Sequence, residues 1–404
     1  MSSKNINKKV LSGNHSVAYG VKLSKASVIS AYPITPQTAI IEKLSEFVER
    51  GELKARIIKV ESEHSALAAT FGAALGGARA FTATSSHGLL YMHEWLHWVS
   101  RSRIPVVMAI VTRTIGLPWN IWPDHSDYMD QRDTGWIMTF GMDNQEVLDL
   151  TLQAFKLSED PDIYLPVIVG LEGFVLGGTY MPVLLPDERE AEDFVGERAQ
   201  PYTIDPKNPI AIGNMTLPEG TEEMFMDMQK SMMNVYKKAK EIDSEYGKIF
   251  GRSYGGLTAC YKCEDAKYMI VTMGAWSGDA IEAVNVLRSE GYPVGLLRVR
   301  YFRPMPTEDY KKYLFNSKMT IVFDRSISYG STGSIYQDVI SSLHLASSKI
   351  NVVHNVIAGI GGVDMTLKDF YEIFRSFLKQ YESGDESNKV VWYHKGVMNN
   401  FSFE

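Results

Sequence analysis

The chain has 404 residues, of which 45% are hydrophobic and 22% are charged, and its net charge is −7. This length allows two or three domains with sizeable cores, and the composition excludes an intrinsically disordered chain. The net charge is negative and the chain has no long cluster of lysines and arginines, so nucleic acid is not expected as a partner.

The apolar runs are too short to span a bilayer, and residues 1–16 lack the apolar stretch of a signal peptide. The chain has two cysteines, Cys260 and Cys263. So few thiols favour a reducing, cytoplasmic location and argue against a disulfide framework. They are also too few to hold an iron–sulfur cluster in the usual way, because such a cluster takes four thiolates.

The first half of the chain alternates short β-rich runs with helical segments. The expected strands are residues 26–30, 56–60, 79–84, 105–112 and 164–169. The expected helices are residues 40–50, 61–75, 88–101 and 145–157. This alternation predicts a doubly wound, mainly parallel sheet, whose ligands bind beyond the carboxyl ends of the strands.

Residues 182–218 break the alternation and contain scattered prolines, so an irregular connector is expected there, followed by a Met-rich helix over residues 219–248. A second, smaller α/β domain is expected after it. Its expected strands are residues 268–273, 294–299, 320–324 and 351–357, and its expected helices are residues 279–289, 334–345 and a segment after 366. The expected domain boundaries are 1–200 for the first domain, 201–255 for the connector and helix, 256–380 for the second domain and 381–404 for a C-terminal tail.

The stretch YPITP, residues 32–36, stands between the first expected strand and its helix. Pro33 holds Tyr32 extended and Pro36 suits the first turn of a helix, so Thr35 is expected to cap that helix. A helix N-terminus presents backbone N–H groups, which can bind a carboxylate or a phosphate. Read alone, an ordinary strand–turn–helix junction is the simpler interpretation.

Other polar residues follow neighbouring strand ends. Glu63 begins a helix of small residues, where a carboxylate either meets a ligand or simply favours the helix dipole. Arg113 ends a strongly apolar strand, where a cation has a carboxylate partner or an anionic ligand. The loop after it contains Asp124, His125 and Asp127, which are metal-ligand types but also common in ordinary turns, so no metal is assigned.

Two further motifs are weaker. Cys260 and Cys263 form a CxxC motif without a thioredoxin-type βαβ start, so two free thiols just before a strand are expected rather than a redox pair. Gly361 and Gly362 resemble a phosphate-binding loop only loosely, because GxGxxG is absent, and a turn is expected there.

Together these motifs resemble the alpha subunit of 2-oxoacid:ferredoxin oxidoreductases, specifically the pyruvate enzymes. The matching residues are YPITP at 32–36, Ser62-Glu63, Arg113, Asp124-His125-Ser126-Asp127 and GGVDMT at 361–366. The resemblance covers nearly the whole chain and implies an α/β fold: a doubly wound thiamine-diphosphate-binding domain of the pyrimidine type, then a smaller transketolase C-terminal-like domain. GGVDMT lacks the arginine of the family's usual GGRDVT, so a role for that side chain does not carry over.

The resemblance also implies an activity and a site. The family oxidatively decarboxylates pyruvate, or runs the reverse reaction, using thiamine diphosphate, CoA and ferredoxin, and yields acetyl-CoA and CO2. By similarity, Glu63 would be catalytic and bind the aminopyrimidine ring. The other implied site residues are Pro33 and Ile34 beside the cofactor, Thr35 and Arg113 for the substrate, and Asp124, His125 and Asp127 in a nearby loop.

The resemblance implies partner chains as well. Diphosphate and Mg²⁺ would be held mainly by the beta subunit, and the [4Fe-4S] clusters would lie on other chains among the beta, gamma and delta subunits. The substrate alternatives are 2-oxoglutarate, a branched-chain 2-oxoacid or oxalate, although Thr35 stands where the oxalate relative has arginine. A non-catalytic scaffold subunit is the remaining alternative, which the joint presence of Glu63, Thr35 and Arg113 argues against.

Overall fold

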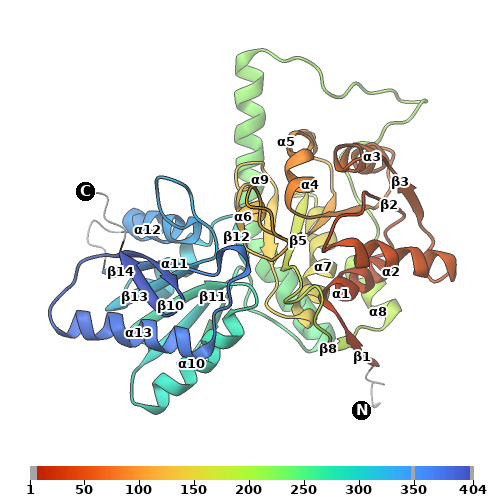
Figure 1. Ribbon diagram of the computed structural model, residues 1–404. Helices are drawn as coiled ribbons and strands as arrows, with labels where there is room; N and C mark the ends of the chain where they lie inside the picture. The colour runs from red at the N-terminus through yellow and green to blue at the C-terminus, as the bar shows by residue number, and fades with distance from the viewer. Residues whose placement is uncertain (1–6, 347–350, 401–404) are drawn as a thin grey trace.

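The computed structural model describes residues 7–346 and 351–400, which form two α/β domains lying side by side (Figure 1). Each domain is built on a seven-stranded sheet. A two-stranded ribbon pairs β1 (Asn7–Leu11) with β8 (Met181–Leu185) near the N-terminus. In the part of the chain that the structure describes, no helix is long and apolar enough to cross a membrane.

The first sheet has the strand order β12-β6-β7-β5-β4-β2-β3. Its strands are β2 (Val28–Ala31), β3 (Arg56–Lys59), β4 (Ala80–Thr84), β5 (Val107–Thr112), β6 (Ile137–Phe140), β7 (Val167–Glu172) and β12 (Tyr301–Arg303). All pair in parallel except β12, which comes from the second half of the chain and runs antiparallel to β6. The predicted parallel sheet is therefore confirmed, with two strands that were not expected: β6, in the stretch between residues 112 and 145, and β12, from the second half of the chain.

Helices cover both faces of this sheet. They are α1 (Gly13–Leu23), α2 (Thr38–Glu49), α3 (Glu63–Leu75), α4 (Ser86–Tyr91), α5 (His93–Arg101), α6 (Ser126–Met129), α7 (Asn144–Ser158) and α8 (Glu188–Val195). Along β5, Val107 and Ala109 enter the core on one face while Met108 and Ile110 enter the core on the other. This alternation follows from the two-residue period of a strand, so an apolar run without polar interruptions is what a sheet covered on both sides requires.

The second sheet has the strand order β16-β15-β14-β13-β10-β11-β9. Its strands are β9 (Thr258–Tyr261), β10 (Tyr268–Met273), β11 (Val294–Val299), β13 (Met319–Asp324), β14 (Val352–Ile357), β15 (Val390–His394) and β16 (Val397–Asn400). Its helices are α10 (Ser277–Ser289), α11 (Thr307–Leu314), α12 (Ser334–Ala346) and α13 (Leu367–Glu382), with a 3-10 turn η1 (Ile360–Gly362). The edge strands β9 and β16 are antiparallel to their neighbours, and β15 and β16 come from the expected tail.

Several local expectations are wrong. Thr35 does not cap a helix, because residues 34–37 form a turn in which the Gln37 N–H donates to the Ile34 carbonyl at 2.9 Å, and α2 begins only at Thr38. The Thr35–Pro36 peptide within this turn is cis. The region 182–218 is not wholly irregular, because it contains most of β8 and all of α8. The single helix expected over 88–101 is two helices, α4 and α5.

The Met-rich helix is confirmed as α9 (Pro218–Phe250), which has 33 residues. Its C-terminal half packs on the first domain through Val235, Ala239 and Tyr246, which are buried. Its N-terminal half rises beyond the body of the two domains (Figure 1), but it keeps contacts with the first domain, because Arg103 pairs with Asp227 and the Arg101 guanidinium lies 4.5 Å from the centre of the Phe225 ring. Met224 and Met226 on this half are exposed.

A buried ionic network joins the two domains. Glu146, in α7, accepts hydrogen bonds from Arg298 at 2.7 and 3.0 Å and from the Nε of Arg300, and all three side chains are buried. Burial opposes ionisation of Glu146, but the charges of Arg298 and Arg300 outweigh it and lower its pKa. Such a pair is costly to break, because removing one partner leaves buried charge uncompensated.

The first prediction concerns this network. Glu146→Gln should lower the free energy of unfolding by about 3 kcal/mol near neutral pH, because the buried guanidinium of Arg298 loses its counter-charge and that of Arg300 keeps only Asp243, 3.6 Å from its Nη1. The folded pKa of Glu146 is lowered, so its stabilisation is present above the ordinary glutamate pKa and is lost as pH falls through the folded value. The gap in melting temperature between wild type and variant should therefore stay constant from about pH 7 to about pH 5 and narrow only as the pH falls below about 4.3.

Differential scanning calorimetry measures both effects. The matched control is Glu245→Gln, because Glu245 pairs with Lys156 but is 44% exposed. An exposed pair contributes at most about 1 kcal/mol, so this variant should differ little from wild type. A gap for Glu146→Gln that stays constant with pH would contradict the assignment.

Candidate functional site

The predicted site residues follow the carboxyl ends of parallel strands in the first sheet. The turn 32–37 follows β2, Glu63 follows β3, Ser85 to His87 follow β4, and Arg113 follows β5. Because these strands are parallel neighbours, the loops meet at one edge of the sheet.

Glu63 is the first residue of α3, behind the N-cap Ser62, whose hydroxyl accepts from the Ser65 N–H at 3.2 Å. Its side chain is only 8% exposed, yet its carboxylate makes no hydrogen bond or ion pair with any residue that the structure describes. It packs against Gly88 of α4 so closely that a Cβ there would lie 2.6 Å from Glu63 Oε1. A buried carboxylate without a partner is costly, and its place at the sheet edge points to a ligand that donates to it.

The YPITP turn is fixed by side-chain hydrogen bonds to its backbone carbonyls, and two of its side chains are exposed. The Gln37 amide donates to the Tyr32 carbonyl at 2.8 Å, and the Asn14 amide donates to the Pro36 carbonyl at 2.8 Å. Pro33 and Thr35 are exposed, and Ile34 is half-buried. The turn is therefore a fixed surface at the edge of the sheet.

Arg113 is 5% exposed and lies beside this turn. Its Nη1 donates to the Thr35 carbonyl at 2.9 Å, its Nε donates to the Asn120 carbonyl at 3.4 Å, and its guanidinium stands 5.1 Å from the ring of Trp119. No carboxylate among the described residues forms an ion pair with it. Burial accordingly lowers the pKa of Arg113. The sequence predicted either a carboxylate partner or an anionic ligand for Arg113. Because no described carboxylate pairs with it, an anionic ligand is the partner that fits the structure.

The loop residues Asp124, His125 and Asp127 do not converge. The Asp127 carboxylate accepts from the Ser86 N–H at 2.7 Å and the Arg113 N–H at 3.0 Å. It thus joins the loops that follow β4 and β5. Burial raises the pKa of Asp127 to about 8, against the effect of these backbone donors. Within the described residues no three His, Cys, Asp or Glu side chains are placed to hold a metal ion.

Asp124 and His125 instead reach the second domain. The Gly361 N–H donates to Asp124 Oδ2 at 2.9 Å, so the GGVDMT segment docks on this loop. Gly361 and Gly362 lie in the expected turn, where Gly362 has a φ of +88° and an added Cβ would stand 2.2 Å from Trp122 Cβ. Glycine is required there by both backbone conformation and space.

Glu172 was missed by the sequence reasoning. It ends β7, and its Oε1 lies 3.1 Å from His125 Nε2 and accepts from the Ala275 N–H of the second domain at 2.9 Å. His125 and Glu172 are fully buried. The sequence did contain a signal for it. Glu172 is an ionisable residue at the end of an apolar strand, the same pattern that singled out Arg113.

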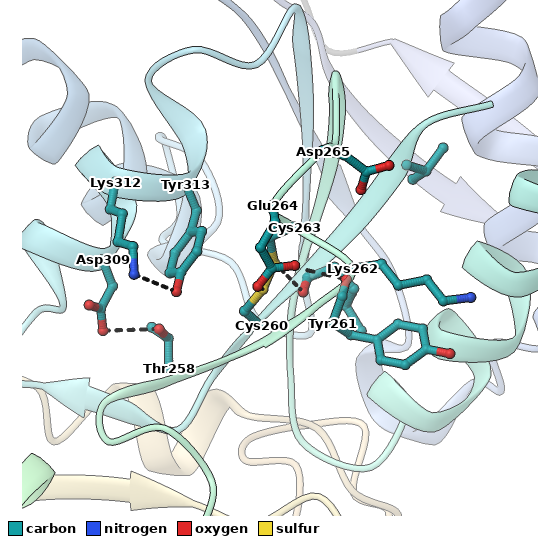
Figure 2. The surroundings of a disulfide bond; sticks show 12 residues. Thr258, Cys260, Tyr261, Lys262, Cys263, Glu264, Asp265, Asp309, Lys312 and Tyr313 are labelled. Carbon is teal, nitrogen blue, oxygen red and sulfur yellow. Dashed lines mark hydrogen bonds between the residues drawn. A yellow bond between two sulfur atoms is a disulfide. The ribbon is translucent and has the colours of Figure 1, made fainter.

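The two cysteines lie elsewhere, at the edge strand β9 of the second sheet. The expectation of two free thiols is wrong, because Cys260 and Cys263 form a disulfide (Figure 2). Cys260 lies in β9 and Cys263 in the turn after it, and this turn brings their Cα atoms to 5.8 Å from each other.

Two known protein families match successive parts of the chain. The family described as "Pyruvate flavodoxin/ferredoxin oxidoreductase, thiamine diP-bdg" matches residues 19–248. The family described as "Pyruvate:ferredoxin oxidoreductase core domain II" matches residues 266–370.

Curated relatives match over almost their whole length. The ketoisovalerate oxidoreductase subunit VorA of Pyrococcus horikoshii is 40% identical over 388 residues, covering 96% of this chain and 98% of the relative. The pyruvate synthase subunit PorA of Methanocaldococcus jannaschii is 41% identical over 388 residues, covering 95% and 97%.

Among solved structures, a 2-oxoglutarate:ferredoxin oxidoreductase from Magnetococcus marinus superposes with a TM-score of 0.70 at 20% identity. The match covers 93% of this chain and 66% of that chain. A split-gene transketolase, described as an inactive beta4 tetramer, has a TM-score of 0.51 at 13% identity, covering 92% and 99%. At these identities the likeness concerns the fold alone, and it confirms the predicted α/β architecture.

The second prediction tests Glu172. Glu172→Ala should raise the amide exchange rate of residues 120–127 about tenfold or more, because the Ala275 N–H and His125 lose a buried partner. Glu172→Gln keeps an acceptor oxygen and should stay near wild type. Hydrogen–deuterium exchange by mass spectrometry measures this, and equal exchange in wild type and the alanine variant would exclude a positioning role.

Proposed function

The chain belongs to the family of alpha subunits of 2-oxoacid:ferredoxin oxidoreductases, and we propose that it forms one half of an active site that decarboxylates pyruvate. The observation that carries the proposal is that two buried charged groups lie at one edge of this sheet without an ion-pair partner among the described residues: the carboxylate of Glu63 and the guanidinium of Arg113.

The thiamine diphosphate site is proposed at Glu63. When bound, this cofactor supplies the nucleophilic carbon and the electron sink for decarboxylation. Glu63 would accept a hydrogen bond from the aminopyrimidine ring and hold its proton there, which is general acid–base work. Gly88 has no side chain, which lets α4 approach the carboxylate closely, because a Cβ there would lie 2.6 Å from Glu63 Oε1. Pro33 and Ile34 would form the neighbouring wall.

The substrate is proposed to meet Arg113. A 2-oxoacid carries a carboxylate beside a carbonyl, and a guanidinium without an ion-pair partner suits the carboxylate. Because Arg113 already donates to the Thr35 carbonyl, its remaining N–H groups are held in a fixed direction. Thr35 would thereby position the cation and present its own exposed side chain to the substrate.

The choice of 2-oxoacid rests on the motif pattern, which resembles the pyruvate enzymes. The specific competitor is a branched-chain acid, because relatives named ketoisovalerate oxidoreductase and pyruvate synthase are equally similar to this chain, at 40% and 41% identity. 2-Oxoglutarate and oxalate remain further alternatives.

The site is proposed to be completed by partner chains. Large apolar residues beside it are exposed: Leu117 by 92%, Trp119 by 62% and Trp122 by 52%. An apolar rim around a ligand site is typical of a surface that another chain covers. We assign diphosphate and Mg²⁺ mainly to a beta subunit, the [4Fe-4S] clusters to other chains among the beta, gamma and delta subunits, and the role of electron acceptor to ferredoxin, with CoA as co-substrate.

The third prediction separates an enzyme subunit from a non-catalytic scaffold. Glu63→Gln in the assembled complex should reduce CoA-dependent, pyruvate-driven reduction of a viologen dye by about 10²–10⁴-fold, the usual contribution of a positioned acid–base group. Assembly, followed by size-exclusion chromatography, should be unchanged, because the side chain makes no hydrogen bond or ion pair with any described residue of the chain.

The control for this variant is Glu61→Gln, a neighbouring carboxylate that is exposed and bonded to Ser65. It should turn over at a near wild-type rate. Near-normal turnover of Glu63→Gln would remove Glu63 from the mechanism and leave the scaffold alternative.

The fourth prediction concerns Arg113. Arg113→Ala should raise the apparent KM for the 2-oxoacid about tenfold or more with a smaller change in kcat, because ground-state binding of the carboxylate is lost. Arg113→Lys keeps the charge but not the bidentate geometry, so its KM should lie between those of the wild type and the alanine variant. An unchanged KM in the alanine variant would contradict carboxylate binding.

The fifth prediction concerns the substrate. A panel of pyruvate, 2-ketoisovalerate, 2-oxoglutarate and oxalate, assayed with the co-purified complex by viologen reduction, should give the highest kcat/KM with pyruvate. A higher kcat/KM with 2-ketoisovalerate would move the proposal to the branched-chain reaction without changing the site.

A further inference from the structure

The Cys260–Cys263 disulfide lies in a part of the chain that the proposed chemistry does not use. Cys260 is the third residue of β9, the edge strand of the second sheet, and Cys263 lies in the turn after it. The two sulfurs differ in access. Cys263 is 6% exposed, whereas Cys260 is half-buried.

Cys260 lines a cleft of about 590 Å³ that opens beside α11. Figure 2 shows Lys312 and Tyr313 of α11 on one side of the disulfide and the turn after β9 on the other. A thiolate approaching through this cleft would meet the sulfur of Cys260. The sulfur of Cys263 lies behind it, against β11.

The surroundings suit the reduced state as well as the oxidised one. Cys263 Sγ stands 3.2 Å from the Leu296 carbonyl oxygen, so a thiol there has an acceptor for its S–H. Cys260 Sγ stands 3.5 Å from Glu264 Oε1, which offers an acceptor to the other thiol. Neither cysteine would therefore be left without a partner on reduction.

The disulfide is also expected to contribute little to the stability of the folded domain. It closes a ring of only residues 260–263, and the stabilisation from loop closure grows with the length of the loop. The strand is held independently by its antiparallel pairing with β11, in which Cys260 is opposite Leu297 and Tyr261 is opposite Leu296. Reduction should therefore leave the second domain folded.

We propose that Cys260 and Cys263 form a reversible thiol–disulfide exchange site whose co-reactant is a dithiol. A thiolate of the reductant attacks Cys260 Sγ, the bond between the two sulfurs breaks, and its electron pair leaves on Cys263 Sγ, which takes a proton. The second thiol of the reductant, as thiolate, then displaces Cys260, which is protonated in turn. The reductant ends as a disulfide and the chain as a dithiol, so two electrons and two protons are transferred.

Reversibility is tested on the full chain in its assembled complex, without denaturant. Dithiothreitol followed by iodoacetamide should give two alkylated cysteines by mass spectrometry. When dithiothreitol is removed and oxidised glutathione is added before iodoacetamide, both should return to the unreactive disulfide, with release of two glutathione thiols. Thiols that appear only after denaturation, or that oxidised glutathione does not close again, would overturn the proposal.

The order of attack is tested with single substitutions treated with oxidised glutathione. Cys263→Ser leaves the accessible Cys260, which should form a mixed disulfide. Cys260→Ser leaves the buried Cys263, which should react at least about tenfold more slowly, because access limits exchange. Circular dichroism melting checks that both variants are folded, and equal rates in folded variants would contradict Cys260 as the sulfur that is attacked.

Discussion

The carboxylate of Asp127 is the contact on which the arrangement of the site depends. It accepts from the backbone N–H groups of Ser86 and Arg113 and so fixes the loops that follow two adjacent parallel strands. Arg113 then reaches the Thr35 carbonyl after a third strand. Glu63, after the edge strand beside it, packs on Gly88, two residues beyond Ser86. One buried carboxylate thus sets the relative positions of the groups that would meet cofactor and substrate.

The same loop joins the domains. Asp124 accepts from the Gly361 N–H, and His125 pairs with Glu172, which also accepts from the Ala275 N–H of the second domain. These contacts are buried and give partners to Asp124 Oδ2, His125 Nε2 and Glu172 Oε1, and buried hydrogen bonds of this kind are costly to lose. The second domain therefore helps to fix the loop of the first domain whose Asp127 positions Arg113.

Local patterns in the sequence predicted much of this structure. The apolar runs of the strands, the amphipathic helix now seen as α2 and the polar residues at strand ends all follow from short-range periodicity. Thr35 was predicted wrongly, because the pattern did not indicate where the helix begins. The turn closed by Gln37 delays the start of α2 to Thr38, so Thr35 cannot cap it. Glu172 and Asp127 acquire their roles from partners far along the chain, and Cys260 and Cys263 form their bond because the turn after β9 brings them together, which spacing alone did not decide.

The central claim is that Glu63 is left without a protein partner because its partner is the cofactor. The most direct test is a structure of the assembled complex with thiamine diphosphate bound. The account predicts the Glu63 carboxylate within hydrogen-bonding distance of an aminopyrimidine nitrogen, with the contacts of Asp127 to Ser86 and Arg113 retained. An aminopyrimidine ring bound away from Glu63, or a Glu63 carboxylate paired with a residue of another chain, would contradict it.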